Sequence, residues 1–216
     1  MIKFLNGVEE KIEKKTINKE EEYYGVGSFV LEIIKIILLA FIIIFPIRVF
    51  VFQPFFVQGA SMEPNFEDGE YLIVNELGYK KTIIGTEGKE FLTIKPFKNL
   101  TRQQSIVFRF PLDEKKYFIK RVIGLPGEKV EIKNNQVKIY NQENPDGFAL
   151  NEREYLASSV RTVGDLVITL DPDEYFVMGD NRMFSSDSRA WGPVKDKDII
   201  GKVLLRAWPL GRIEVF

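Results

Sequence analysis

The chain contains neither histidine nor cysteine among its 216 residues. Without histidine, a Ser-His-Asp triad is excluded. Without cysteine, there is no thiol nucleophile, no disulfide framework and no thiolate zinc site. The formal net charge of −1 gives no general attraction to nucleic acid. We therefore expect no metal, no cofactor and no nucleic-acid partner, and any nucleophilic serine must take its base from a lysine or a carboxylate.

One long apolar run is present, from Phe29 to Ile47, interrupted only by Glu32 and Lys35. As a helix these residues would extend about 28 Å, enough to cross the hydrocarbon core of a bilayer. The uncharged part, residues 36–47, would also suit the core of a cleaved signal peptide. A retained transmembrane helix over residues 29–48 is favoured, because a long charged stretch precedes it and no small-x-small cleavage site follows it promptly.

The charge distribution around this run predicts its orientation. Five lysines precede it, whereas after Arg48 no lysine or arginine occurs before Lys80. Since cytoplasmic flanks carry the excess of basic residues, we expect a single-pass protein with residues 1–28 as a charged cytoplasmic tail. Residues 49–216 are expected to form the domain outside.

Beyond the run the pattern becomes that of a mainly β domain. Short segments rich in β-branched and aromatic residues alternate with turn signals such as Asn134-Asn135. The expected strands are residues 71–74, 106–110, 117–123, 129–132, 136–140, 166–170, 175–178 and 202–207. A small lobe is expected as an insertion at about residues 133–170. Residues 80–104 fit strands poorly and are expected to form a polar surface loop.

Three stretches carry chemistry-bearing residues: Gln58-Gly-Ala-Ser-Met-Glu-Pro64, Tyr117-Phe-Ile-Lys-Arg-Val-Ile-Gly-Leu-Pro-Gly127 and Met178-Gly-Asp-Asn-Arg-Met-Phe-Ser-Ser-Asp-Ser-Arg189. Taken singly, each has an ordinary explanation. A serine between small residues suits a turn, Lys120 and Arg121 suit an edge strand that resists aggregation, and the third stretch suits a polar turn.

Taken together and in this order, the three stretches resemble the motifs of bacterial type I signal peptidases (leader peptidases). The resemblance covers about residues 30–206 and implies a mostly antiparallel, barrel-like β domain. It implies that Ser61 is the nucleophile, that Lys120 is its general base, and that Ser185 hydrogen-bonds and orients the lysine. The family positions that support the site through ion pairs correspond to Arg121, Asp180, Asp187 and Arg189.

Two segments depart from the family pattern. Gly59 occupies the position at which some members have a serine that donates to the oxyanion, so the Ser61 backbone N–H remains as a donor. For that reason Gly59→Ser is expected to change turnover only modestly. The family's Arg-Gly-Asp-Ile-Val-Val-Phe segment corresponds to Arg102-Gln-Gln-Ser-Ile-Val-Phe108, which removes no catalytic residue.

A lysine base must be neutral, and its ordinary pKa is about 10.4. We expect burial beside Phe118 and closeness to Arg121 to lower the pKa of Lys120. Ser61 and Lys120 are 59 residues apart, so only tertiary folding can join them. No serine of the chain has a lysine at the third position after it, which excludes the Ser-x-x-Lys arrangement of β-lactamases.

The expected function is that of a membrane-anchored serine endopeptidase that removes signal peptides from secreted preproteins. By resemblance, these substrates are cut after a small-x-small sequence outside the cytoplasmic membrane of a bacterium. The substrate is expected to add as an extended strand between two segments that include Pro54, Phe55, Val57, Gly59, Tyr117 and Ile119. Two alternatives remain open: a Ser-Lys protease dedicated to one exported substrate, and an inactive anchored binding module.

Overall fold

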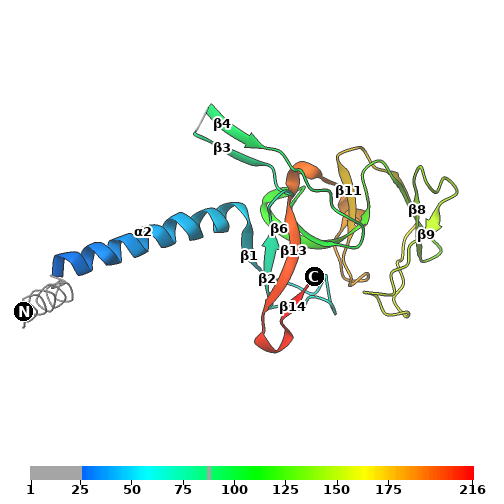
Figure 1. Ribbon diagram of the computed structural model, residues 1–216. Helices are drawn as coiled ribbons and strands as arrows, with labels where there is room; N and C mark the ends of the chain where they lie inside the picture. Colours follow the sequence, from blue (N-terminus) through cyan, green and yellow to red (C-terminus); the bar gives the residue numbers. More distant parts are fainter. Residues whose placement is uncertain (1–25, 87–88) are drawn as a thin grey trace, which may run out of the picture. The chain divides into compact units, whose positions relative to one another are not determined.

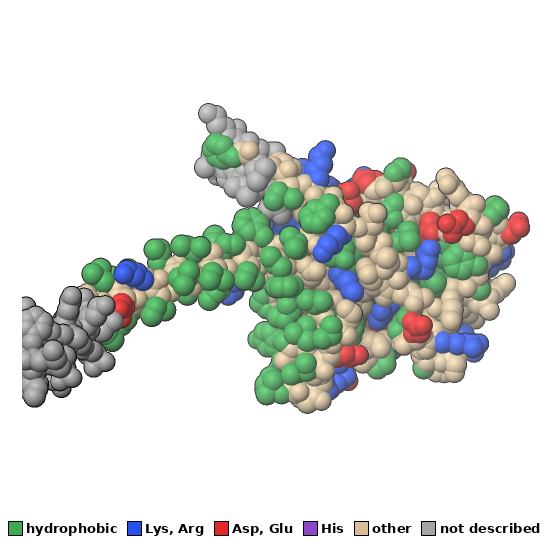
Figure 2. All heavy atoms as spheres, viewed as in Figure 1, with side chains coloured by type: hydrophobic (Ala, Val, Ile, Leu, Met, Phe, Trp, Pro, Cys, Tyr) green, Lys and Arg blue, Asp and Glu red, His purple; other side chains and the backbone are tan. Residues whose placement is uncertain are grey.

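The computed structural model describes residues 26–86 and 89–216, and the chain divides into two compact units, Met1–Pro46 and Ile47–Phe216. In the first unit the described part is helix α2 (Val26–Phe50), which continues into the start of the second. Its segment Val26–Arg48 has 23 residues and is long and apolar enough to cross a membrane. Figure 2 shows hydrophobic side chains along α2. Most of the predicted tail, residues 1–28, lies outside the described residues, and the crossing at residues 29–48 stays a prediction.

The second unit is built on an eight-stranded sheet in the order β1-β2-β13-β5-β6-β11-β12, with β14 paired to β13 (Figure 1). All its pairings are antiparallel. The strands are β1 (Phe52–Phe56), β2 (Tyr71–Asn75), β5 (Ser105–Phe110), β6 (Asp113–Gly124), β11 (Glu174–Met178), β12 (Val194–Lys195), β13 (Ile199–Trp208) and β14 (Glu214–Val215). Short helices α3 (Ser188–Trp191), η1 (Asp196–Asp198) and η2 (Leu210–Arg212) lie between later strands.

The sheet curls, so that its edge strand β1 approaches the middle of β6. The Phe55 ring on β1 lies 5.4 Å from the Tyr117 ring on β6, measured between centroids. Phe55 and Ile119 also pack against one buried apolar cluster: Val57, Met62, Phe66, Leu72, Val74, Val107, Ile200 and Val203. Removing such side chains from water stabilises a fold by about 1.5–3 kcal/mol each. This core therefore holds the end of β1 close to β6.

A second, four-stranded sheet has the order β10-β7-β8-β9. Its strands are β7 (Lys129–Lys133), β8 (Gln136–Tyr140), β9 (Phe148–Ala149) and β10 (Leu166–Thr169). Asn134 and Asn135 connect β7 to β8 with φ values of 51° and 60°, the left-handed conformation that a tight two-residue hairpin requires. Ile132, Val137 and Ile139 of this sheet share a buried cluster with Phe176 and Met178 of β11. We call residues 129–169 the small lobe, and the boundaries of 133–170 expected from the sequence stay a prediction.

The mainly β, antiparallel fold predicted from the sequence is confirmed, and each of the eight expected segments falls on a strand. The expectation of a loop at residues 80–104 is wrong. Strands β3 (Thr82–Thr86) and β4 (Lys89–Ile94) form a separate hairpin there. Thr82-Ile83-Ile84 and Phe91-Leu92-Thr93-Ile94 have the β-branched and aromatic residues of strands, but flanking lysines mask this pattern.

Candidate active site

Ser61 lies on the turn that follows β1, and three contacts fix this turn. Gly59 adopts φ +89°, a left-handed conformation that favours glycine, and its N–H donates to Asp68 Oδ1 over 2.6 Å. The Asn181 backbone N–H donates to the Ser61 carbonyl at 3.1 Å, and the Asn181 side-chain amide donates to the Ala60 carbonyl at 3.0 Å. The serine is therefore held by a loop that is distant in sequence.

Lys120 projects from β6 toward Ser61 and is only 3% exposed. Its Nζ lies 2.6 Å from Ser61 Oγ and donates to the Ile119 carbonyl at 2.7 Å. Burial lowers the pKa of Lys120 to about 8, against the opposing influence of the Asp187 and Asp180 carboxylates. At that pKa about a tenth of the Lys120 amines are neutral at pH 7, far more than at the ordinary pKa, and only a neutral amine can accept a proton.

The expected part of Arg121 in lowering this pKa is wrong. The Arg121 guanidinium is paired with Asp180 through two hydrogen bonds, of 2.7 Å from Nε to Oδ1 and 2.5 Å from Nη2 to Oδ2. It also donates to the Gln103 carbonyl at 2.7 Å. The Asp180 carboxylate offsets the charge of Arg121. Desolvation of the Lys120 amine is therefore what lowers its pKa.

Asp187 and Arg189 form a second ion pair beside the site, with Arg189 Nε 2.8 Å from Asp187 Oδ1. Asp187 also accepts from the Gly179 N–H at 3.0 Å and caps helix α3 through the Arg189 N–H. Burial alone would raise the pKa of Asp187, but the bonds from Arg189 and Gly179 outweigh it and lower the pKa. The carboxylate therefore stays charged and holds both ends of the loop 179–189.

Ser185 is placed next to the catalytic pair but does not form the hydrogen bond to Lys120 that the resemblance implies. Its side chain packs against Gly179, where a Cβ would overlap both Ser185 Oγ and the Ser61 carbonyl oxygen. The Lys120 amine is already bonded to Ser61 Oγ and the Ile119 carbonyl.

A cleft of about 690 Å³ lies between β1 and β6 and ends at the pair. Of the residues predicted to bind substrate, Phe55, Val57, Gly59, Tyr117 and Ile119 line it. Pro54 does not: it is exposed and pairs with Ile73 of β2. Among the described strands, β1 pairs only with β2, and residues 113–120 of β6 pair only with β5. Both strands thus face the cleft with an unpaired edge.

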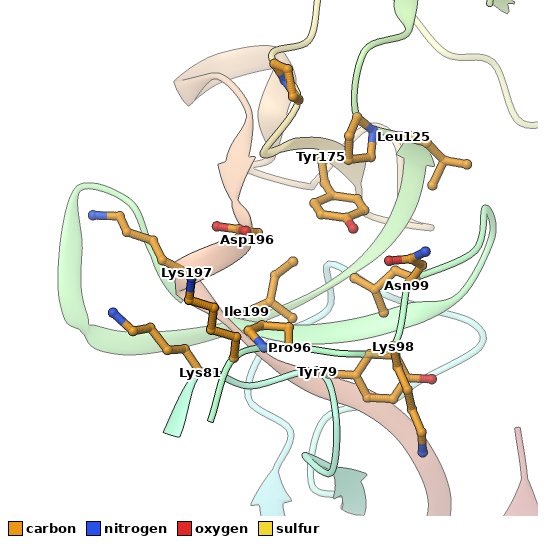
Figure 3. Close-up of a pocket in the computed structure, with 14 residues that line it drawn as sticks. Tyr79, Lys81, Pro96, Lys98, Asn99, Leu125, Tyr175, Asp196, Lys197 and Ile199 are labelled. Carbon is orange, nitrogen blue, oxygen red and sulfur yellow. The ribbon is translucent and has the colours of Figure 1, made fainter. Parts of the chain in front are cut away.

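A larger cavity, of about 750 Å³, lies elsewhere in the second unit (Figure 3). It is lined by Tyr79, Tyr175, Asp196 and several lysines, and by no residue of the three motif stretches except Leu125 and Pro126. The Lys98 side chain points away from it (Figure 3). This cavity contains neither a serine nor a buried base, so the smaller cleft is the better candidate.

The sequence did not single out three groups that shape the site. Asn181 and Gly179 lie inside the third motif stretch, so their position was a usable signal. Asn65 gives no such signal, yet its amide donates to both Asp180 Oδ2 at 2.9 Å and the Tyr155 carbonyl at 2.7 Å. Among the described residues, no group of three or more carboxylates is arranged to hold a metal ion.

Comparison with known proteins identifies one family. The family model described as "Signal peptidase, peptidase S26" matches residues 30–208. Signal peptidase I P of Bacillus subtilis subsp. natto is 34% identical over 189 residues, covering 86% of this chain and 93% of that protein. Signal peptidase IB of Staphylococcus aureus (strain COL) is 32% identical over 197 residues, with the same two coverages.

A crystal structure of a signal peptidase I from Enterococcus faecalis V583 aligns with a TM-score of 0.40 and 30% identity, covering 49% of this chain and 97% of that one. The motif order, the antiparallel fold and the family match agree with one another. The chain belongs to the bacterial signal peptidase I family, the serine endopeptidases that remove signal peptides from secreted preproteins.

Proposed function

We propose that Ser61 is the nucleophile and Lys120 the general base of this peptidase. The observation that carries the proposal is the 2.6 Å approach of Lys120 Nζ to Ser61 Oγ, in a site where the lysine is buried and its pKa is lowered to about 8. In its neutral form the amine accepts the hydroxyl proton as Oγ attacks the scissile carbonyl. The resulting ammonium returns that proton to the leaving amine, and water then hydrolyses the acyl-enzyme.

The Ser61 backbone N–H is the proposed donor to the oxyanion. No hydrogen bond among the described residues uses this N–H. The neighbouring Gly59 N–H is directed to Asp68, so it is committed to the turn. One oxyanion donor contributes roughly 10²-fold or more to the rate, which makes the geometry of this turn important for catalysis.

The substrate is proposed to bind as an extended strand between β1 and β6, cut after a small-x-small sequence. The unpaired edges of both strands support this, because each offers backbone donors and acceptors to a peptide between them. In an extended peptide, alternate side chains point the same way. The apolar lining from Phe55, Val57 and Ile119 would receive the small ones.

The proposed location is the cytoplasmic membrane of a bacterium, crossed once by residues 29–48. The five lysines before the span and the lack of lysine and arginine between Arg48 and Lys80 support a cytoplasmic N-terminus, with the catalytic residues 49–216 outside. The lobe inserted at about residues 133–170 would belong to this outer part. Preproteins emerging from the membrane are anchored by an apolar segment themselves, so an anchored enzyme suits them.

Cleavage of a preprotein by the full-length chain in detergent tests the proposed roles. Ser61→Ala and Lys120→Met are expected to abolish cleavage at a small-x-small site, with products identified by mass spectrometry. Ser158→Ala and Lys115→Met, at exposed positions, are the matched controls and should cleave like wild type. Wild-type rates in either catalytic-pair variant would contradict the proposal.

A further inference from the structure

A segment of the small lobe contacts the loop that carries the third motif. This segment lies between β9 and β10 and contains Glu152, Tyr155 and Thr162. Glu152 and Thr162 bond to Arg182 of the loop 179–189, and the Tyr155 ring lies beside Arg121, which pairs with Asp180 of that loop. Tyr155 and Thr162 are buried. We call these three residues the clasp.

Arg182 is the residue of the loop that the clasp holds most directly. Its side chain is 0% exposed. Arg182 Nη2 donates to Glu152 Oε1 at 2.5 Å, Nη1 donates to Glu152 Oε2 at 3.1 Å, and Nη1 also donates to the Thr162 hydroxyl. The fourth bond, from Nε to the Gly179 carbonyl at 3.0 Å, closes the loop on itself. A buried guanidinium needs such partners, so its position is fixed by the clasp.

Tyr155 connects the clasp to the Arg121–Asp180 pair. Its ring lies 4.2 Å from the Arg121 guanidinium carbon, and its hydroxyl donates to Glu152 Oε1 at 2.7 Å. Asn65 then bridges the Tyr155 carbonyl and Asp180 Oδ2. Three successive residues of the loop therefore make different contacts. Asp180 pairs with Arg121, and Asn181 donates hydrogen bonds to the carbonyls of Ala60 and Ser61. Arg182 is bound by the clasp.

We propose that Glu152, Tyr155 and Thr162 are positioning residues for catalysis: by binding Arg182 and covering Arg121, they fix the loop that sets the geometry of Ser61 and Lys120. The small lobe then serves the reaction without touching the substrate cleft, whose lining includes none of these residues. This inference rests on the proposed roles of Ser61 and Lys120. It goes beyond them because it assigns a catalytic consequence to three residues of the small lobe, the nearest of which, Glu152, is 32 residues from Lys120 in sequence.

The test compares Glu152→Gln with Glu154→Gln in the full-length chain, on a small-x-small peptide. Glu154 is exposed and two residues away, with no hydrogen bond or ion pair in the described structure, which makes it a matched control. Loss of one charge beside buried Arg182 displaces the loop. We expect kcat per folded enzyme to fall on the order of 10- to 100-fold, the loss that a misplacement of about 1 Å produces, with KM little changed.

The pH profile separates positioning from mere stabilisation. If the loop moves, Lys120 becomes more solvated, and the alkaline midpoint of kcat/KM should shift upward from about 8. A variant that is only less stable would lower the amount of active enzyme and leave this midpoint in place. Thr162→Val should act in the same direction as Glu152→Gln, whereas Thr162→Ser, which keeps the hydroxyl acceptor, should restore wild-type kinetics.

Wild-type kcat and an unshifted midpoint in folded Glu152→Gln would overturn the proposal. If Glu152→Gln does not fold, the Thr162→Val and Thr162→Ser pair decides by the same two readouts. Failure of the clasp is distinguishable from failure of the proposed function. In the first case Ser61→Ala and Lys120→Met stay inactive while the clasp variants behave like wild type, and in the second the catalytic-pair variants themselves cleave.

Discussion

Replacing Lys120 by methionine is expected to raise the stability of the protein at pH 7 while abolishing its activity. The unfolded chain holds the Lys120 proton up to a pKa of 10.5, whereas burial in the folded state lowers that pKa to about 8. Folding at pH 7 therefore requires an ammonium to enter a site that disfavours it. One pKa unit corresponds to about 1.4 kcal/mol, so the penalty at neutral pH is about 3 kcal/mol.

The sign of the pH dependence follows from proton binding. Between about pH 8 and pH 10.5 the unfolded state binds more protons at this position than the folded state, so the Lys120 contribution to stability becomes more favourable as pH rises. Below pH 8 the full penalty applies, and above pH 10.5 it is gone. Methionine has no such dependence, so the stability advantage of the variant should shrink by about 3 kcal/mol between pH 7 and pH 10.5.

The assay is urea unfolding of full-length wild type and Lys120→Met in the same detergent at both pH values. Tyrosines and carboxylates titrate alike in the two proteins, so their effects cancel in the difference. Any change in packing from the methionine itself is independent of pH and cancels as well. Lys115→Met, at an exposed position of β6, should give a difference near zero at both pH values. A Lys120→Met difference that stays constant or grows with pH would refute the reasoning.

Substitutions at two glycines, Gly179 and Gly59, probe the loop and the turn. Gly179→Ala places a Cβ against Ser185 Oγ and the Ser61 carbonyl, and should lower the free energy of unfolding by about 1–3 kcal/mol and remove most of the activity. The control is Gly211→Ala, because a Cβ there has nothing within 4 Å. Equal thermal stability of the two variants would contradict the account. Gly59→Ser and Gly59→Ala should each lower the free energy of unfolding by about 1 kcal/mol, because φ at this position is +89°. The ratio of the two variants' cleavage rates measures the contribution of the serine hydroxyl to catalysis. A Gly59→Ser enzyme as stable as wild type by urea unfolding would show that this backbone strain is absent.

The elements of the fold were predictable where local pattern and tertiary structure agree. β2, β7 and β8 alternate buried and more exposed residues, so their sequences carry the period of a strand on one face of a sheet. The β3–β4 hairpin, which forms a separate two-stranded sheet, was missed because its lysine-rich flanks suggested a loop. Strand β1 was expected only as a flank of the substrate.

The candidate site was predictable only in its motif residues. Ser61 and Lys120 stand in recognisable stretches, and a buried Lys120 with a lowered pKa was expected because a lysine base must be neutral; the structure agrees on burial as the cause. The expected effect of Arg121 failed because Asp180 pairs with it. Glu152 is 30 residues from Arg182, in a polar segment without periodicity, so its partnership with Arg182 appears only in three dimensions.

The dependence of kcat/KM on pH tests the central claim most directly, since the claim is that Ser61 is activated by neutral Lys120. With a lysine pKa of about 8, the rate of the full-length enzyme on a small-x-small peptide should rise tenfold per pH unit below that value and level off above it. Lys120→Met should show no cleavage at any pH. A rate that is constant from pH 6 to pH 10, or cleavage that survives Lys120→Met, would contradict the account.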